Sequence, residues 1–221
     1  MSISIRSVLA TGLAGAIGLF ASIDAAAHPH VWVDTRSTVL FNDSGAMTGV
    51  YHRWTFDEMF SAYASQGLET EDGELTRESL QPLAQVNVES LHEFDYFTFL
   101  DMGQAPAQFV DPVEYWLEHD GQRLTLHFTL PLDEPLMMDA RTVSIEVYDP
   151  SFFVDFTPAD TEAAALHNAP DYCSLRLEEA EPFDPEIAMR LAQIPADQRD
   201  VPPELMAFTQ DNPNAIHVLC D

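Results

Sequence analysis

Two histidines, His28 and His30, flank a proline directly after a run of alanines, in the stretch AAAHPHVWVD. If the mature chain begins at His28, this residue offers its α-amino group and its imidazole as a chelating pair, and His30 adds a second imidazole. Such nitrogen donors suit borderline ions such as Zn, Ni and Cu. Pro29 has no amide N–H, so a copper motif built on deprotonated backbone nitrogens cannot form through that position.

A carboxylate is expected beside these histidines if the chain folds back as a hairpin. The turn signal at 42–45, Asn-Asp-Ser-Gly, predicts antiparallel strands in which Val33 lies opposite Trp54. Extended one step beyond the regular ladder, this register places His30 opposite Asp57. The predicted site is therefore rich in nitrogen donors, contains one carboxylate, and is open and exchangeable rather than closed and structural.

Each candidate ligand also has a structural interpretation. Asp149, in the sequence YDP, is a further candidate ligand, but a carboxylate before a proline is typical of a turn. The histidines can be ordinary polar residues at the start of a strand, and Asp57 can be a first-turn acid that the helix dipole favours. His52 is predicted to face away from His30. The chain contains no paired C-x-x-C, H-E-x-x-H or calcium-loop pattern.

Residues 1–27 are typical of a secretory signal peptide. One positive charge precedes the apolar run 8–21, which is shorter than the roughly 20 residues that span a bilayer. Ala25 and Ala27 have the spacing that signal peptidase requires, which predicts cleavage after about Ala27. The mature chain 28–221 is predicted to be a single exported domain, and no later segment is apolar enough for stable membrane insertion.

The chain is strongly acidic, with 9 Lys plus Arg against 37 Asp plus Glu and a formal net charge of −28. A surface of this charge repels nucleic acid and anionic lipid, because binding either one depends on basic groups that displace counterions. Nucleic acid is therefore not expected as a partner. A cell that lives in high salt, where screening weakens carboxylate repulsion, explains this acidity without any cation site.

The pattern along the mature chain predicts an α+β fold of mainly antiparallel sheet, sandwich-like, with a helical insertion and a disulfide-tied helical C-terminal segment. A second hairpin turns at Asp120-Gly121 and pairs Leu117 with Leu124, which leaves His127 on the solvated face. A capping box of Thr55 and Glu58 is expected to start the insertion. Further elements follow from residue type and spacing: helices over 76–91 and 184–194, and strands within 94–103 and 141–156.

The two cysteines, Cys173 and Cys220, indicate a disulfide in an exported chain. The bridge would close a loop of roughly 48 residues and stabilise the fold by about 4 kcal/mol on a chain-entropy estimate. A soft-metal pair or free thiols remain as alternatives. Nothing in the chain matches a nucleophile elbow, a P-loop or a dinucleotide fingerprint, and neither cysteine looks like a nucleophile, so we do not expect an enzyme.

Four stretches carry a resemblance to a known family: HPHVWVD, WTFDEMFS, FDYFTFLDMG and VYDPSFFVDF. In this order they resemble the bacterial exported proteins called domain of unknown function 1007, over residues 28 to about 156, whereas the tail beyond Phe156 matches weakly. The resemblance implies a periplasmic protein, described loosely as a component of a transport system and often found with membrane transporters of the nickel and cobalt type. It implies no activity.

The sequence therefore favours a periplasmic protein that binds a divalent transition metal, Zn or Ni first among the candidates, and passes it to or from a membrane metal transporter. His28, His30 and Asp57 are the predicted primary ligands, with Asp149 as a weaker candidate. One alternative is an adaptor or accessory subunit of a transport system that binds no metal. Another is a copper-dependent oxidase with an N-terminal histidine brace. The oligomeric state does not follow from the sequence.

Overall fold

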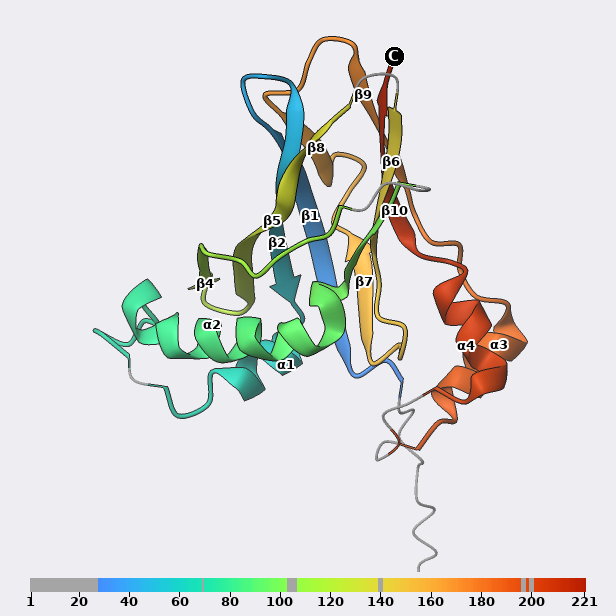
Figure 1. Cartoon of the computed structure of the whole chain (residues 1–221). Coiled ribbons are helices and arrows are strands. Elements are labelled where there is room, and N and C mark those ends of the chain that lie inside the picture. The colour runs from blue at the N-terminus through green and yellow to red at the C-terminus, as the bar shows by residue number, and fades with distance from the viewer. Residues whose placement is uncertain (1–27, 69, 103–106, 139–140, 196–197, 199–200) are drawn as a thin grey trace, which may run out of the picture.

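Two β-sheets pack face to face, and helices lie at one end of them (Figure 1). The computed structural model describes residues 28–221 except 69, 103–106, 139–140, 196–197 and 199–200, so the predicted signal peptide lies outside the described residues. The architecture confirms the predicted α+β fold of mainly antiparallel sheet.

The first sheet is built around a long hairpin of two strands. Its order is β4-β5-β2-β1-β7, and β8 also pairs with β1. The strands are β1 (Val31–Phe41), β2 (Ala46–Phe56), β4 (Tyr115–His119), β5 (Leu124–Met137), β7 (Val154–Pro158) and β8 (Ala164–His167). β7 and β8 run parallel to β1. Every second residue of β1 is buried, as expected for a strand with one face on the core.

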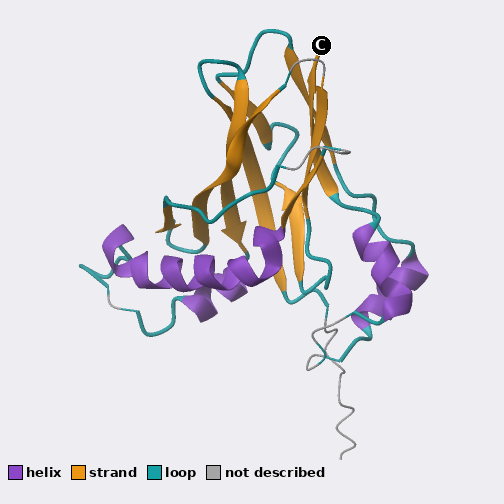
Figure 2. Cartoon of the chain, viewed as in Figure 1, coloured by secondary structure: helices purple, strands orange, loops and turns teal. Residues whose placement is uncertain are grey.

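The second sheet has the order β3-β6-β10-β9 and is antiparallel throughout. Its strands are β3 (Thr98–Asp101), β6 (Arg141–Val147), β9 (Cys173–Glu178) and β10 (Asn214–Cys220). Val39 and Val50 of the first sheet share one buried cluster with Ile145 and Val218 of the second. One hydrophobic core therefore lies between the two layers of strands that Figure 2 shows.

The helices form two groups, one in each of two long connections. The helices are α1 (Glu58–Ala64), α2 (Arg77–Leu91) and the 3-10 helix η1 (His92–Phe97) between β2 and β3, and α3 (Pro185–Ala192) and α4 (Pro203–Gln210) between β9 and β10. Leu80, Ala84 and Val88 are spaced along one face of α2 and are buried in a cluster with Trp54 and Phe128. α2 thus closes the lower end of the first sheet (Figure 1). Within the described residues, no helix combines the length and apolarity needed to cross a bilayer.

Both predicted hairpin registers are wrong by two residues. Leu117 pairs with Leu126 rather than with Leu124, because the turn contains more residues than Asp120-Gly121. In the first hairpin Val33 pairs with Phe56, and an irregularity between Leu40 and Phe41 shifts the ladder. An even shift keeps each side chain on its predicted face, so Leu117 and Leu124 are buried together as expected although their partners differ.

The predicted exposure of His127 is wrong. The residue is only 4% exposed, because the ring of Trp116 stacks on it with 4.6 Å between ring centroids. The hydroxyl of Tyr51 lies 2.6 Å from its Nδ1, and the guanidinium of Arg77 covers the Trp116 ring at 4.3 Å. Aromatic side chains therefore cover a sheet face that alternation alone marks as solvated.

The predicted starts of α2 and α3 and the predicted disulfide agree with the structure, whereas the cap of α1 and part of one predicted strand do not. α2 begins after Thr76, as expected, and α3 begins after Asp184 but ends at Ala192, before the predicted limit. α1 is capped by Asp57 instead of the predicted box at Thr55. The first half of the predicted strand 94–103 is the 3-10 helix. The predicted disulfide is confirmed. It joins Cys173 of β9 to Cys220 of β10, which lie directly opposite each other in the sheet.

His52 gives the fold a testable pH dependence. Its ring is fully buried, its Nδ1 lies 2.8 Å from the Ser37 hydroxyl oxygen, and burial lowers its pKa to about 3. An unfolded chain restores an ordinary pKa of about 6.5. Between about pH 6 and pH 4 the unfolded state therefore binds one proton more, and the unfolding free energy should fall by about 1.4 kcal/mol for each unit of acidification. Denaturant unfolding of His52→Gln over this range should lack that component, whereas the exposed control His167→Gln should keep it. Equal slopes for all three proteins would contradict the assignment.

Candidate metal site at the N-terminal histidines

His28 is held between two distant parts of the chain. Its Nδ1 lies 3.3 Å from the carbonyl oxygen of Phe152, its Nε2 lies 3.0 Å from that of Gln198, and the residue is 4% exposed. A carbonyl oxygen only accepts hydrogen bonds, so a neutral imidazole can donate to one of these two oxygens and not to both. If Nε2 donates across the shorter contact to Gln198, Nδ1 carries the lone pair that a metal requires, which is the usual arrangement of a metal-bound histidine.

The ring of His30 lies beside that of His28. The two ring centroids are 5.1 Å apart, with 75° between the ring planes, and the other neighbour of His30 is the ring of Phe153 at 4.6 Å. Nε2 of His30 is buried and has no hydrogen-bond partner among the described residues. Burial, and to a smaller degree the neighbouring His28, lowers the pKa of His30. The ring is therefore neutral at pH 7 and can act as a ligand.

The separation of the two rings suits one shared ion. An imidazole nitrogen binds zinc at about 2.0 Å, which puts the centre of the ring about 3 Å from the metal. Two rings on the same ion therefore have centroids no more than about 6 Å apart. The observed 5.1 Å between His28 and His30 lies within this limit.

Asp57 caps helix α1, in line with the structural interpretation of this residue. Its Oδ1 accepts a hydrogen bond from the Phe60 amide at 2.8 Å, and its Oδ2 accepts one from the Trp32 amide at 3.0 Å. The amide of Asp57 donates to the carbonyl oxygen of Trp32 at 2.9 Å. Asp57 thus lies opposite Trp32, and its predicted pairing with His30 is wrong. The cause is the two-residue shift of the first hairpin, which moves the carboxylate along the strand.

Asp149 is a turn residue whose carboxylate is saturated with hydrogen bonds. Its Oδ1 accepts from the amide and the hydroxyl of Ser151, and its Oδ2 accepts from the amides of Phe153 and Val154, at 2.7 to 3.0 Å. The residue is 5% exposed. These bonds shape the loop that places Phe152 and Phe153 against the histidines. Asp149 therefore positions the neighbours of the site.

The donors that the structure brings together are thus the two imidazoles. Among the described residues, no three His, Cys, Asp or Glu side chains are grouped closely enough to hold a metal ion. Both cysteines are taken up in the disulfide. Signal-peptide cleavage at the predicted position would add a third nitrogen, the α-amino group of His28.

Sequence reasoning missed the surroundings of the two histidines. The carbonyl groups of Phe152 and Gln198 are 124 and 170 residues away from His28, and no spacing rule connects them. The one local signal was the aromatic pair in YDPSFFVDF, which we assigned to a strand. Phe152 instead has a left-handed backbone with φ of +53°, and this turns its carbonyl oxygen toward His28.

Comparisons with known proteins show what the chain is similar to. The family model described as "Protein of unknown function (DUF1007)" matches residues 13–220. An uncharacterized protein of Haemophilus influenzae is 27% identical over 162 residues, which cover 73% of this chain and 77% of that relative. Neither description names a ligand or an activity.

The cap at Asp57 can be tested apart from any metal. Asp57→Ala removes the acceptor for the Phe60 amide and should lower the unfolding free energy by about 0.5–2 kcal/mol. Asp57→Asn keeps the acceptor for the Phe60 amide but turns an NH2 donor toward the Trp32 amide, so it should recover only part of that loss. Urea unfolding measures both. If Asp57→Asn lost metal affinity while keeping its stability, the carboxylate would have to be a ligand after all.

Proposed function

The chain belongs to the DUF1007 family of proteins of unknown function, and we propose that it binds a divalent transition-metal ion at its processed N-terminus and exchanges that ion with a membrane metal transporter in the periplasm. One observation carries the proposal. The buried Nε2 of His30 has no partner among the described residues, in a ring that lies 5.1 Å from the ring of His28. A buried nitrogen without a partner is costly, and a bound ion would satisfy it.

The proposed donors are three nitrogens from two residues. The α-amino group and Nδ1 of His28 would form a chelate, and Nε2 of His30 would close it. Such a set favours Zn, Ni or Cu over Mg or Ca, which prefer oxygen ligands. The contact of His28 Nε2 with the Gln198 carbonyl oxygen, at 3.0 Å, would hold the ring in the required tautomer. With few protein ligands the ion stays exchangeable, as a carrier needs.

The protein's own contacts compete with the ion. Nδ1 of His28 lies 3.3 Å from the Phe152 carbonyl oxygen, and a protonated Nδ1 can donate to it. Binding a metal at Nδ1 removes that proton and the hydrogen bond together. Metal binding is thus coupled to the position of the loop that contains Phe152, which offers a route for release.

Two further features support export and a partner. A disulfide between Cys173 and Cys220 is compatible with an oxidising compartment such as the periplasm. In β1 and α1, the side chains of Trp32, Met59 and Tyr63 are 44%, 69% and 77% exposed. Large apolar side chains at the surface are often contact residues for another protein. The transporter is the partner we propose for them.

Calorimetric titration of the processed chain with Zn, Ni and Cu tests the proposal. We expect one site in the chain that begins at His28, and at least tenfold weaker binding when one alanine precedes His28, because the amine is then displaced. His30→Gln should weaken binding by a similar factor, and the exposed control His167→Gln should leave it unchanged. Equal binding by all four proteins would remove both the amine and His30 from the site.

The same titration separates the alternatives. Absence of binding by the processed chain at any pH between 6 and 8 would refute the carrier and favour an adaptor role. Selective copper binding accompanied by peroxide consumption would favour the oxidase with a histidine brace. A carrier should instead bind reversibly, without turnover.

Metal affinity should fall on acidification. The α-amino group has an ordinary pKa of about 7.7 and must lose its proton before it can bind. The lowered pKa of His30 means that protons compete at this ring only at more acidic pH. We therefore expect the affinity to fall by up to about tenfold between pH 8 and pH 6.5 from the amine alone, and more steeply below pH 6. A metal dissociation constant that does not change with pH would contradict an amine ligand.

A further inference from the structure

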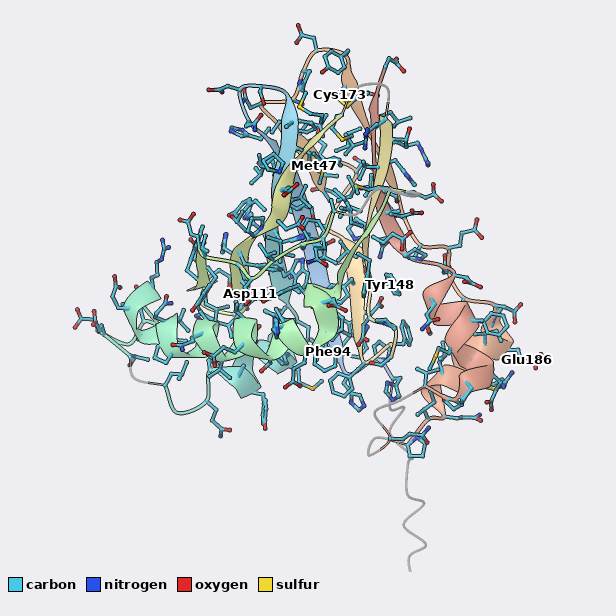
Figure 3. The ribbon with its side chains drawn as sticks, in the orientation of Figure 1. Met47, Phe94, Asp111, Tyr148, Cys173 and Glu186 are labelled. Carbon is cyan, nitrogen blue, oxygen red and sulfur yellow. A yellow bond between two sulfur atoms is a disulfide. The ribbon has the colours of Figure 1, made fainter. Side chains whose placement is uncertain are left out.

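A second site is suggested by a cavity on the side of the molecule where α3 and α4 lie. The cavity has a volume of about 210 Å³ and is formed by strand β7, the β9–α3 connection and the α4–β10 turn. Tyr148, one of its lining residues, lies between the strands and the two helices (Figure 3). Two side-chain hydrogen bonds join the segments around the cavity. Thr209 donates to the carbonyl oxygen of Pro150 at 3.0 Å, and Asn214 donates to the carbonyl oxygen of Phe156 at 2.6 Å.

Aromatic residues make up part of the wall. The lining includes Tyr148, Phe152 and Phe183. Phe152 and Phe183 meet edge to face, with 5.2 Å between ring centroids. Faces of aromatic rings attract weakly hydrated cations, because the ring carries negative charge density above and below its plane.

Asp155 of β7 brings a carboxylate to this cavity. It is half-buried, and no hydrogen-bond donor or arginine among the described residues contacts its side chain. Burial raises the pKa of Asp155, as expected for a carboxylate that has lost water without gaining a counter-ion. None of the described lining residues is an arginine or a histidine, and the exposed Glu179 and Glu181 add negative charge to the lining.

We propose that this cavity binds an organic cation, an alkylammonium or guanidinium group, with Asp155 as its counter-ion and the aromatic rings as its walls. A bare divalent ion fits less well, because the described residues offer no three grouped ligands. The size is also informative. Pockets for drug-sized molecules occupy about 300–1,000 Å³, so this smaller cavity suits a head group of a few heavy atoms. Such a head group is available from a free amine or from a basic side chain of another protein.

Nuclear magnetic resonance titration tests the site with defined probes. Tetramethylammonium and butylammonium chloride are added to the processed chain, with sodium chloride at equal ionic strength as the reference. We expect saturable shifts at residues that line the cavity, and at least tenfold weaker binding by Asp155→Asn. The matched control is Glu186→Gln, which removes one exposed carboxylate from α3 and should bind like the wild type (Figure 3). Shifts that never saturate, or equal binding by Asp155→Asn, would overturn the proposal.

The thermal stability of Asp155→Asn keeps this test interpretable. A carboxyl group with a raised folded-state pKa destabilises the fold above its unfolded pKa of about 3.9, and the penalty disappears below that pH. Asp155→Asn should therefore melt at the same temperature as the wild type, or higher, at pH 7, and the difference should shrink toward pH 4. Lost binding in a fully folded variant then reports on the site itself.

A short arginine peptide distinguishes the two sources of the cation. If Gly-Arg-Gly amide binds more tightly than butylammonium and depends on Asp155, the site takes a basic side chain of a partner. If the small amines bind more tightly, the site takes a free amine. The site does not include the two N-terminal imidazoles, so a metal titration that fails leaves this result unaffected.

Discussion

The parallel pairing of β1 with β7 is the constraint on which the N-terminal region depends. Just before β1 becomes regular, the amide of His30 donates to the Phe153 carbonyl oxygen at 2.8 Å. Val31 then pairs with Val154, and this register continues along the strand. Because the chain segments are hydrogen-bonded at this point, the side chains of His30 and Phe153 fall on one face and stack. The environment of the histidines is thus set by backbone geometry as well as by side-chain chemistry.

The buried carboxylate of Asp149 stabilises the loop that precedes β7. Asp149 accepts four hydrogen bonds from the loop that leads to β7, so its charge is well solvated by protein groups although water is excluded. The loop in turn presents the Phe152 carbonyl oxygen to His28 and the Phe152 ring to Phe183. Phe152 is therefore shared: its carbonyl oxygen contacts the proposed metal site, and its residue lines the proposed cation cavity.

The strong negative charge of the protein favours cations at both proposed sites. With a formal net charge of −28, the protein attracts cations of any kind, and selectivity has to come from local chemistry. Nitrogen donors at His28 and His30 favour transition metals, whereas aromatic walls around Asp155 favour large, weakly hydrated cations. The carboxylate of Asp57 adds to the negative charge, and each of its two oxygens accepts one amide hydrogen bond.

The sequence by itself determined the features that depend on neighbouring residues: the buried face of each hairpin strand, the start of α2 after Thr76, the pairing of two cysteines and the closeness of two histidines across one proline. Tertiary structure decided the rest. Turn length and a strand irregularity set the registers, so the partner of Asp57 changed without altering which face is buried. The true register of the second hairpin also puts Trp116 opposite His127, whose ring it covers. The acceptors of His28 lie 124 and 170 residues away. Such contacts depend on how distant segments pack, and a local pattern of residue types contains no information about that packing.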